Sequence, residues 1–260
     1  MTVQSRDQLS ERQRRLLEIL EQSGGASVRE LSERCSVSEM TIRRDLDVFE
    51  RAGLVKRHCG GAVVVARRNT NETPLQLRSG ERREEKERIA RHVVGQVREG
   101  SSLALGNGST TLSVAALLGS YSRLTVLSPS LHIALVLAQF PAVTTLLPGI
   151  TVRSGEASMV GPEAARAVAD FFFDLCIVGA AGVDPSIGVT EHNVDEASVI
   201  RAMLGRATRR VVVADSSKIG RIATVVVSTV TTIDEIVTGH EADNDALEEL
   251  RAQGVEVTTV

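Results

Sequence analysis

The sequence predicts an α/β protein in two parts, a small helical domain with a β-hairpin and a larger domain built on a mostly parallel sheet. Three observations predict this class. Helical apolar stripes and a Gly-Gly turn fill the first 68 residues, a polar stretch ending in Pro74 follows, and short apolar runs then alternate with helical segments. We therefore expect a first domain over residues 9–68, a linker over 69–80 and the α/β domain over 81–260.

Composition narrows the class of protein. Of the 260 residues, 42% are hydrophobic and 24% charged, which is typical of a globular chain. The longest apolar runs are too short to cross a membrane, and the charged N-terminal segment does not resemble a secretory signal, so we expect a cytoplasmic protein. Aromatic residues make up only 2%, which argues against stacking surfaces for single-stranded nucleic acid. Cys35, Cys59 and Cys176 are too scattered for a disulfide framework, and the histidines lack helical pairing, so no metal site is expected.

The first two helices are predicted from their apolar stripes and end signals. Leu16, Leu17, Ile19 and Leu20 share one face of a helix that Gly24-Gly25 ends. The second helix opens at Ser27, because Ser27 and Glu30 have the spacing of a capping box. We expect its buried residues to be Val28, Leu31 and Cys35.

A third helix and a hairpin complete the first domain. Ser38 is the expected N-cap, Ile42, Leu46 and Phe49 fall on one face, and Gly53 ends the helix. Residues 54–57 and 62–65 then flank the Gly60-Gly61 turn, as in a two-stranded hairpin.

Two helices joined by a short turn and followed by a hairpin predict a winged helix-turn-helix, whose second helix enters the DNA major groove. Residues 1–68 carry a net charge of +3 and the remainder −6, so the first domain has the sign of charge expected of a DNA-binding segment. The alternative is a small bundle whose arginines are simply solvated. The candidate DNA-contacting residues lie at the helix starts and in the hairpin: Ser27, Ser38, Glu39, Met40, Thr41, Arg43, Arg44, Lys56, Arg57 and His58.

In the larger domain a charged helix is predicted over residues 81–97, followed by alternating strands and helices. Strands are expected at 103–105, 124–127, 143–147, 175–178 and 211–214, and helices at 111–118, 130–139, 162–172, 195–207 and 243–253. This order is typical of βαβ units with a sheet covered on both faces. Ligands of such sheets bind beyond the carboxyl ends of the strands.

Three polar loops follow strands at that edge: residues 106–111, 179–184 and 215–220. The first has the glycines, hydroxyls and helix start that suit a phosphate, and Lys218 in the third offers a cation. Alternatively, the first loop is only a tight turn and Lys218 only a surface lysine. The first loop lacks the lysine of a P-loop and the third glycine of a dinucleotide fingerprint, so no nucleotide cofactor is expected.

These residues carry a family resemblance. Residues 37–46 (Val-Ser-Glu-Met-Thr-Ile-Arg-Arg-Asp-Leu) and the later His-Cys-Gly-Gly-Ala at 58–62 resemble the helix-turn-helix signature of the DeoR family of bacterial transcriptional regulators, with Cys59 inserted in the wing turn. The larger domain resembles the family's sensor domain at 108–111, 128–131, 160–162, 179–183 and 214–220. That domain is similar in fold to ribose-5-phosphate isomerase. The resemblance implies an effector site formed by Asn107, Gly108, Ser109, Thr110, Thr111, Ser128, Gly179, Ala180, Gly182 and Lys218.

We therefore expect a DNA-binding repressor of carbohydrate-metabolism genes, released from operator DNA by a phosphorylated sugar or related metabolite. Such a regulator is expected to act as a homodimer or homotetramer, because paired half-sites raise affinity. The alternative is a sugar-phosphate isomerase fused to a DNA-binding module. Isomerisation needs well-placed carboxylates, and Asp184, Glu191 and Asp215 are the remaining acids. We favour a protein that is not an enzyme, because 179–182 is Gly-Ala-Ala-Gly where the isomerases carry paired acidic residues.

Overall fold

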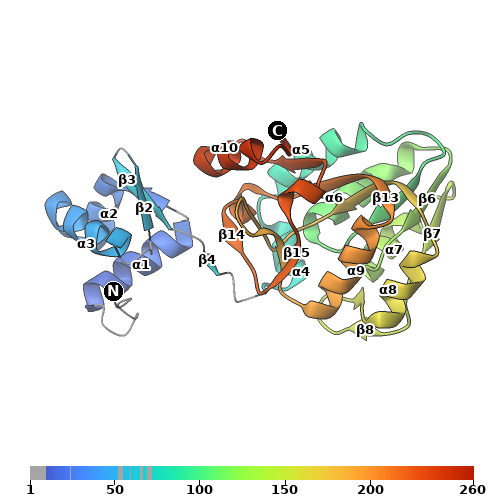
Figure 1. Cartoon of the computed structure of the whole chain (residues 1–260), viewed down its shortest axis with the longest axis horizontal. Helices are drawn as coiled ribbons and strands as arrows, with labels where there is room; N and C mark the ends of the chain where they lie inside the picture. The colour runs from blue at the N-terminus through green and yellow to red at the C-terminus, as the bar shows by residue number, and fades with distance from the viewer. Residues whose placement is uncertain (1–9, 24, 52–54, 59, 65–66, 69–71) are drawn as a thin grey trace. The chain divides into compact units, whose positions relative to one another are not determined.

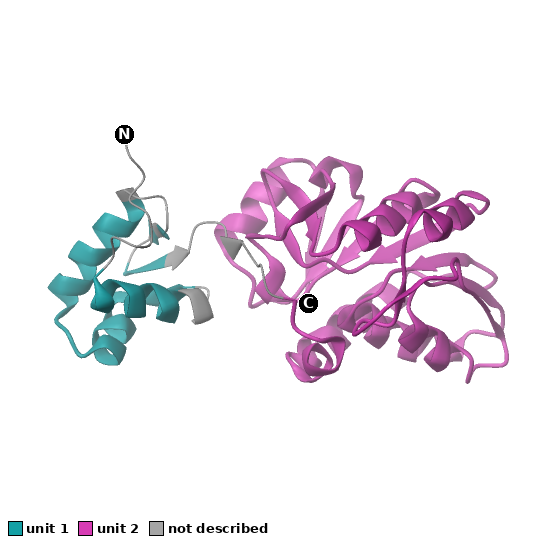
Figure 2. Cartoon of the chain, turned by 90° about the horizontal axis from the view of Figure 1, so that it is seen from below, with its two compact units in different colours: residues 1–67 teal, residues 68–260 magenta. Residues whose placement is uncertain are grey.

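The computed structural model describes residues 10–260 except 24, 52–54, 59, 65–66 and 69–71. The chain forms two compact units, residues 1–67 and residues 68–260, shown in teal and magenta in Figure 2. Residues 75–80, which fall within the predicted linker, form a helix of the second unit, α4 (Leu75–Gly80).

The first unit is a helix-turn-helix with a small sheet. Ser36 turns the chain between the second and third helices with a φ of 55°, in the left-handed region. Leu16, Leu31, Ile42 and Phe49 are fully buried, so all three helices contribute to one core. The helices are α1 (Glu11–Ser23), α2 (Val28–Cys35) and α3 (Glu39–Arg51).

The predicted hairpin is present, with one further strand. β2 (Val55–His58) pairs with β3 (Gly61–Val64), and β3 also pairs with β1 (Gly25–Ser27), all antiparallel. The Ser27 hydroxyl accepts a hydrogen bond from the Glu30 N–H at 3.2 Å, so the predicted N-cap is observed. The predicted stop at Gly53 and the inserted Cys59 lie outside the described residues.

The second unit is built on a seven-stranded parallel sheet of order β17-β16-β13-β10-β5-β6-β7 (Figure 1). The five predicted strands are present, and two that sequence patterns missed, β16 and β17, extend one edge. The strands are β5 (Ser102–Leu105), β6 (Leu124–Leu127), β7 (Val143–Leu146), β10 (Phe173–Val178), β13 (Ala207–Val213), β16 (Glu235–Thr238) and β17 (Glu256–Thr259).

Helices cover both faces of this sheet. Alternate residues of β10 enter different cores: Leu175 and Ile177 pack in the cluster that includes α5, α6 and α7, whereas Cys176 and Val178 pack in the cluster that includes α8, α9 and α10. The runs 175–178 of β10 and 211–213 of β13, which are buried on both faces, are apolar, as predicted. The helices are α5 (Arg83–Val94), α6 (Ser109–Leu117), α7 (Leu131–Leu137), α8 (Pro162–Ala169), α9 (Val194–Leu204) and α10 (Asn244–Ala252).

A second, antiparallel sheet corrects one prediction. Residues 179–184 were expected to form a loop, but residues 182–184 form a strand that ends at Asp184 and pairs with a strand that ends at Glu191. Val183, Val189 and Thr190 of these strands are fully buried. This sheet consists of β11 (Gly182–Asp184), β12 (Gly188–Glu191) and β15 (Val225–Ser228). The remaining short elements are β4 (Arg67–Arg68), β8 (Val152–Arg153), β9 (Ser158–Met159), β14 (Arg221–Ile222) and the 3₁₀ turns η2 (Leu118–Ser120), η3 (Ser216–Lys218) and η4 (Val230–Thr232).

In the described part of the chain, no helix combines the length and apolar character that a membrane crossing requires.

Candidate functional site

Helix α3 presents a polar face beside its buried stripe. Met40 is 60% exposed, and Arg43 and Arg44 are exposed, whereas Ile42 and Leu46 are fully buried. The predicted contact residues Ser38 and Glu39 are also exposed, and Thr41 is half-buried. Arg43 donates to Glu39 Oε2 at 3.0 Å, so DNA contact by Arg43 requires this ion pair to open. Arg44 has no ion pair within the described ranges.

Asp45, in the same motif, holds the helices together. Its buried carboxylate accepts hydrogen bonds from Arg12 at 3.0 and 3.1 Å and from Gln13 at 3.1 Å, which ties α3 to α1. Sequence reasoning missed this role because neither Arg12 nor Gln13 is near Asp45 in the chain.

The other predicted DNA contacts lie at the start of α2 and in the hairpin. Ser27 is exposed and caps α2. Arg57 pairs with Asp47 of α3, and its backbone N–H donates to Glu50 Oε1 at 3.0 Å, which fixes β2 against α3. Lys56 and His58 belong to β2.

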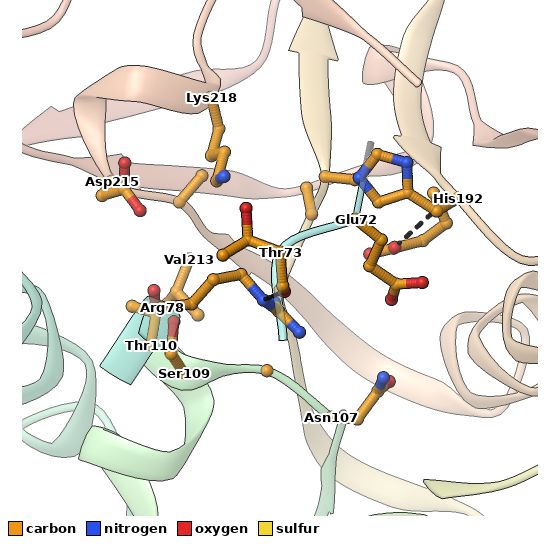
Figure 3. Close-up of a pocket in the computed structure, with 16 residues that line it drawn as sticks. Glu72, Thr73, Arg78, Asn107, Ser109, Thr110, His192, Val213, Asp215 and Lys218 are labelled. Carbon is orange, nitrogen blue, oxygen red and sulfur yellow. Dashed lines mark hydrogen bonds between the residues drawn. The ribbon is translucent and has the colours of Figure 1, made fainter. Parts of the chain in front are cut away.

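The second unit contains a pocket at the carboxyl ends of β5, β10 and β13, where the three predicted loops meet (Figure 3). The space between its lining residues is about 610 Å³, including the part that is open to solvent. Sixteen residues line it: Glu72, Thr73, Arg78, Asn107, Gly108, Ser109, Thr110, Gly179, Ala180, Ala181, Glu191, His192, Val213, Ala214, Asp215 and Lys218.

One side of the pocket is suited to an anion. Gly108 precedes α6 with a φ of 137°, a conformation that only glycine adopts readily, and the first-turn N–H groups of α6 lack intrahelical partners. Ser109 and Thr110, in that turn, are 7% and 6% exposed and line the pocket. Lys218 lies on the same side in Figure 3.

Lys218 has no counterion of its own among the described residues, although Asp215 is close by. Asp215 is approached instead by Lys86 Nζ and Arg82 Nε, each at 3.8 Å. Burial lowers the pKa of Lys218, and the attraction of Asp215 only partly offsets it. The ammonium group is therefore available to a bound anion.

Lys86, by contrast, is fully engaged. Its ammonium donates to the carbonyl oxygens of Arg78 at 2.6 Å and Glu81 at 2.8 Å, and the residue is 2% exposed. Lys86 thus anchors the segment that enters α5, whereas Lys218 faces the pocket.

The opposite side of the pocket is acidic. Arg153 pairs with Glu72 and, at 2.9 Å, with Glu196. Glu196 Oε1 also accepts from Asn107 Nδ2 at 3.2 Å. A continuous hydrogen-bonded chain therefore links the loop that carries Asn107 to Glu72, at the start of the second unit.

Glu191 and His192 complete this side. Burial raises the pKa of Glu191 to about 8, and the charge of Glu196 adds to the effect. His192 Nδ1 is buried without a hydrogen-bond partner in the described structure, and burial lowers the pKa of the His192 ring. The Glu191 carboxyl accepts one hydrogen bond in the described structure, from the His192 backbone N–H at 3.4 Å, so both side chains keep hydrogen-bonding capacity for a ligand.

Of the predicted effector residues, the pocket brings together Asn107, Gly108, Ser109, Thr110, Gly179, Ala180 and Lys218. Three others lie outside its lining. Thr111 is buried and donates to the Gly108 carbonyl at 3.0 Å, Ser128 Oγ accepts from the Ser130 N–H at 3.2 Å, and Gly182 begins β11, where a side chain would collide with Arg221.

Sequence reasoning did not assign Glu72, Thr73, Arg78 and His192 to the pocket. The first three come from the stretch interpreted as linker, whose composition gives no sign of a ligand-facing role. Of the three candidate catalytic acids, Glu191 and Asp215 line the pocket, whereas Asp184 does not and accepts from the N–H groups of Ser186 and Ile187. Within the described ranges no group of three or more His, Cys, Asp or Glu side chains is arranged to hold a metal ion.

A winged helix-turn-helix preceding an α/β unit with a polar pocket is the architecture of a DNA-binding regulator. Residues 12–68 match the DeoR-like helix-turn-helix domain, and residues 81–240 match the DeoR C terminal sensor domain. The chain belongs to the DeoR family of transcriptional regulators.

Curated relatives match along nearly the whole chain. The HTH-type transcriptional regulator GlpR of Haloferax volcanii is 34% identical, covering 95% of this chain and 96% of the relative. The Glycerol-3-phosphate regulon repressor of Escherichia coli K12 is 32% identical, covering 88% and 90%. Among solved structures, ribose 5-phosphate isomerase A of Methanocaldococcus jannaschii is similar in a region that covers 52% of this chain and 54% of the isomerase chain, with 18% identity and a TM-score of 0.39. A likeness this low says nothing about activity.

Proposed function

We propose that this regulator represses carbohydrate-metabolism genes and leaves its operator when a phosphorylated sugar or related metabolite occupies the pocket. One observation carries the proposal. The first turn of α6, with the Ser109 and Thr110 hydroxyls, shares a pocket with Lys218, a cation that has no counterion of its own in the described structure. N–H groups at a helix start, hydroxyls and an ammonium are the donors that a phosphate accepts from.

The relatives support the same class of regulated genes. One is a repressor of a glycerol-3-phosphate regulon, which makes a small phosphorylated metabolite a reasonable class of effector for this chain.

The position of the pocket suggests how occupancy reaches the DNA-binding unit. Glu72 and Arg78 line the pocket, and Glu72 is only five residues beyond Arg67, where the first unit ends. Both side chains are held by ion pairs, Glu72 with Arg153 and Arg78 with Glu156. A phosphorylated ligand that competes with Glu156 for Arg78 changes the anchoring of residues 72–78, next to the segment that connects the units. A ligand shifts such an equilibrium only by its different affinity for the two states.

A thermal-shift screen of the full chain against phosphorylated sugars tests this function, because a ligand that binds only the native state raises its stability. The discriminating variant is Thr110→Val, which removes one hydroxyl from the proposed phosphate side. Thr144→Val makes the same change on β7, outside the pocket lining. We expect a stabilising phosphorylated compound whose effect is reduced in Thr110→Val and kept in Thr144→Val. The proposal would be contradicted if the compound stabilised both variants equally, or if no phosphorylated compound stabilised the parent chain or either variant.

A further inference from the structure

The two sides of the pocket differ in charge. In Figure 3, Lys218 and Asp215 lie at the upper left, Ser109 and Thr110 at the lower left (the first side), and Glu72 and His192 at the right (the second side), with the Arg78 side chain extending from the left toward the centre. Asp215 is approached by Lys86 and Arg82, each at 3.8 Å. The ammonium on the first side has no ion pair of its own within the described residues. The second side contains more carboxylates than cations.

Ion pairing on the second side is already complete. Arg153 is shared between Glu72 and Glu196, so one guanidinium faces two carboxylates. Burial opposes ionisation of Glu72, but the hydrogen bonds and charge of Arg153 outweigh it and lower the pKa of Glu72. Glu72 is therefore ionised at neutral pH, and no surplus positive charge awaits a ligand on this side.

Uncharged hydrogen-bonding capacity remains there. In the described structure His192 Nδ1 is buried and unpartnered, and the Glu191 carboxyl accepts a single hydrogen bond, from the His192 backbone N–H at 3.4 Å. A ligand hydroxyl satisfies such groups, because it both donates and accepts. A ligand carboxylate or phosphate only accepts, and it would meet Glu72 at close range in a partly water-excluded pocket.

We propose, on the basis of the function proposed above, that the effector carries a single anionic group, bound on the Lys218 side, and presents hydroxyls to Glu72, Glu191 and His192. The effector class is then the sugar and polyol monophosphates. Bisphosphates and phosphorylated sugar acids are rejected, and Glu72 is the residue that rejects them.

Matched pairs of compounds test this inference by isothermal titration of the full chain. Glycerol 3-phosphate is compared with glycerate 3-phosphate, fructose 6-phosphate with fructose 1,6-bisphosphate, and glucose 6-phosphate with 6-phosphogluconate. In whichever pair binds, we expect the compound with a single anionic group to bind at least about tenfold more tightly than its partner with two. The second anionic group would lie close to the Glu72 carboxylate, and like charges at close range in a pocket repel strongly.

Two variants and one matched control assign the effect to residues. Glu72→Gln keeps an acceptor for Arg153 but removes the charge, so the preference within the pair should shrink to about threefold or less. Glu163→Gln, an exposed glutamate of α8 that pairs with Arg166 at 3.2 Å, is the matched control and should keep the full preference. His192→Ala should weaken the sugar monophosphate about tenfold while leaving inorganic phosphate unchanged.

The outcomes separate this inference from the function on which it rests. Binding of the bisphosphate or sugar acid as tightly as its partner, abolished by Lys218→Met, would overturn the inference and leave the proposed function standing. Binding of no phosphorylated compound would overturn both. Unchanged preference in Glu72→Gln would remove Glu72 from the account even if the preference itself were observed.

Discussion

Replacing Lys218 with methionine should stabilise the protein and weaken effector binding at the same time. Methionine keeps the length of the side chain but removes an ammonium that is half-buried and has no ion pair in the described structure. Burial lowers the pKa of Lys218, as it lowers that of Lys86, but the Lys218 ammonium has no hydrogen-bond acceptor in the described structure to offset the cost of burying its charge, whereas Lys86 has two. Removing the charge therefore removes the cost, together with the cation proposed to bind the effector phosphate.

The magnitudes follow from general values. An imperfectly satisfied polar group costs about 1–3 kcal/mol, and the lower value applies to Lys218 because its ammonium opens onto the pocket. A gain of about 1 kcal/mol raises the melting temperature of a unit of this size by about 2–4 °C. A lost hydrogen bond to a charged group costs about 1.5–3 kcal/mol, so effector affinity should fall about 10- to 150-fold.

Tyrosine fluorescence follows the relevant unit alone, because the chain's one tyrosine, Tyr121, lies in the second unit. Lys86→Met is the contrasting control. That lysine donates to two carbonyl oxygens and lies 3.8 Å from Asp215, so its loss should cost about 3–5 kcal/mol and lower the melting temperature by about 6–20 °C. Destabilisation by Lys218→Met, comparable to that by Lys86→Met, would refute the view that Lys218 is free for a ligand.

Three further predictions concern the DNA-binding unit and pH. Arg43→Ala and Arg44→Ala should each weaken binding to a duplex selected from a random pool. Loss of an arginine that reads a base should cost about 1–3 kcal/mol of binding free energy, and loss of one that pairs with a phosphate should mainly reduce the dependence of DNA affinity on salt concentration. Unchanged affinity in both variants would contradict the recognition-helix assignment. Asp45→Asn should destabilise the first unit by about 2 kcal/mol, measured by circular dichroism, because three hydrogen bonds to a buried carboxylate weaken. The pKa of Glu191 is raised from 4.5 to about 8, so between these values the folded chain holds a proton that the unfolded chain releases. The free energy of unfolding should therefore fall as pH rises through that window, and Glu191→Gln should make the fall smaller. An unaltered dependence of stability on pH in Glu191→Gln would contradict this assignment.

Local patterns predicted the central fold well because strong local signals coincide with it. The capping residues Ser27 and Ser38 and the apolar stripe of Ile42, Leu46 and Phe49 set the helix-turn-helix. Short apolar runs predicted five of the seven strands of the parallel sheet, β5, β6, β7, β10 and β13. Strands β16 and β17 were missed because they carry polar residues, such as Glu235 and Thr258, which hydrogen-bond each other across the strand pair at 2.7 Å. Pairing in three dimensions, not local sequence, makes them strands.

The pocket was predictable only where its residues follow strands. Asn107, Ser109 and Lys218 stand in loops at the carboxyl edge of a parallel sheet, and topology alone brings them together. Glu72 and Arg78 reach the pocket through long-range ion pairs with Arg153 and Glu156, and no local pattern encodes those partners. The acidic side of the pocket therefore emerged only from the structure.

The most direct test of the central claim is the dissociation constant for a selected DNA duplex with and without a saturating sugar monophosphate that binds the pocket. Coupling between two sites typically changes affinity about 5- to 150-fold, and the effect is reciprocal. We expect the phosphorylated compound to weaken DNA binding by a factor in that range, and the duplex to weaken binding of the compound by the same factor, with both effects lost in Lys218→Met. DNA affinity that stays unchanged while the pocket is demonstrably occupied would contradict the account.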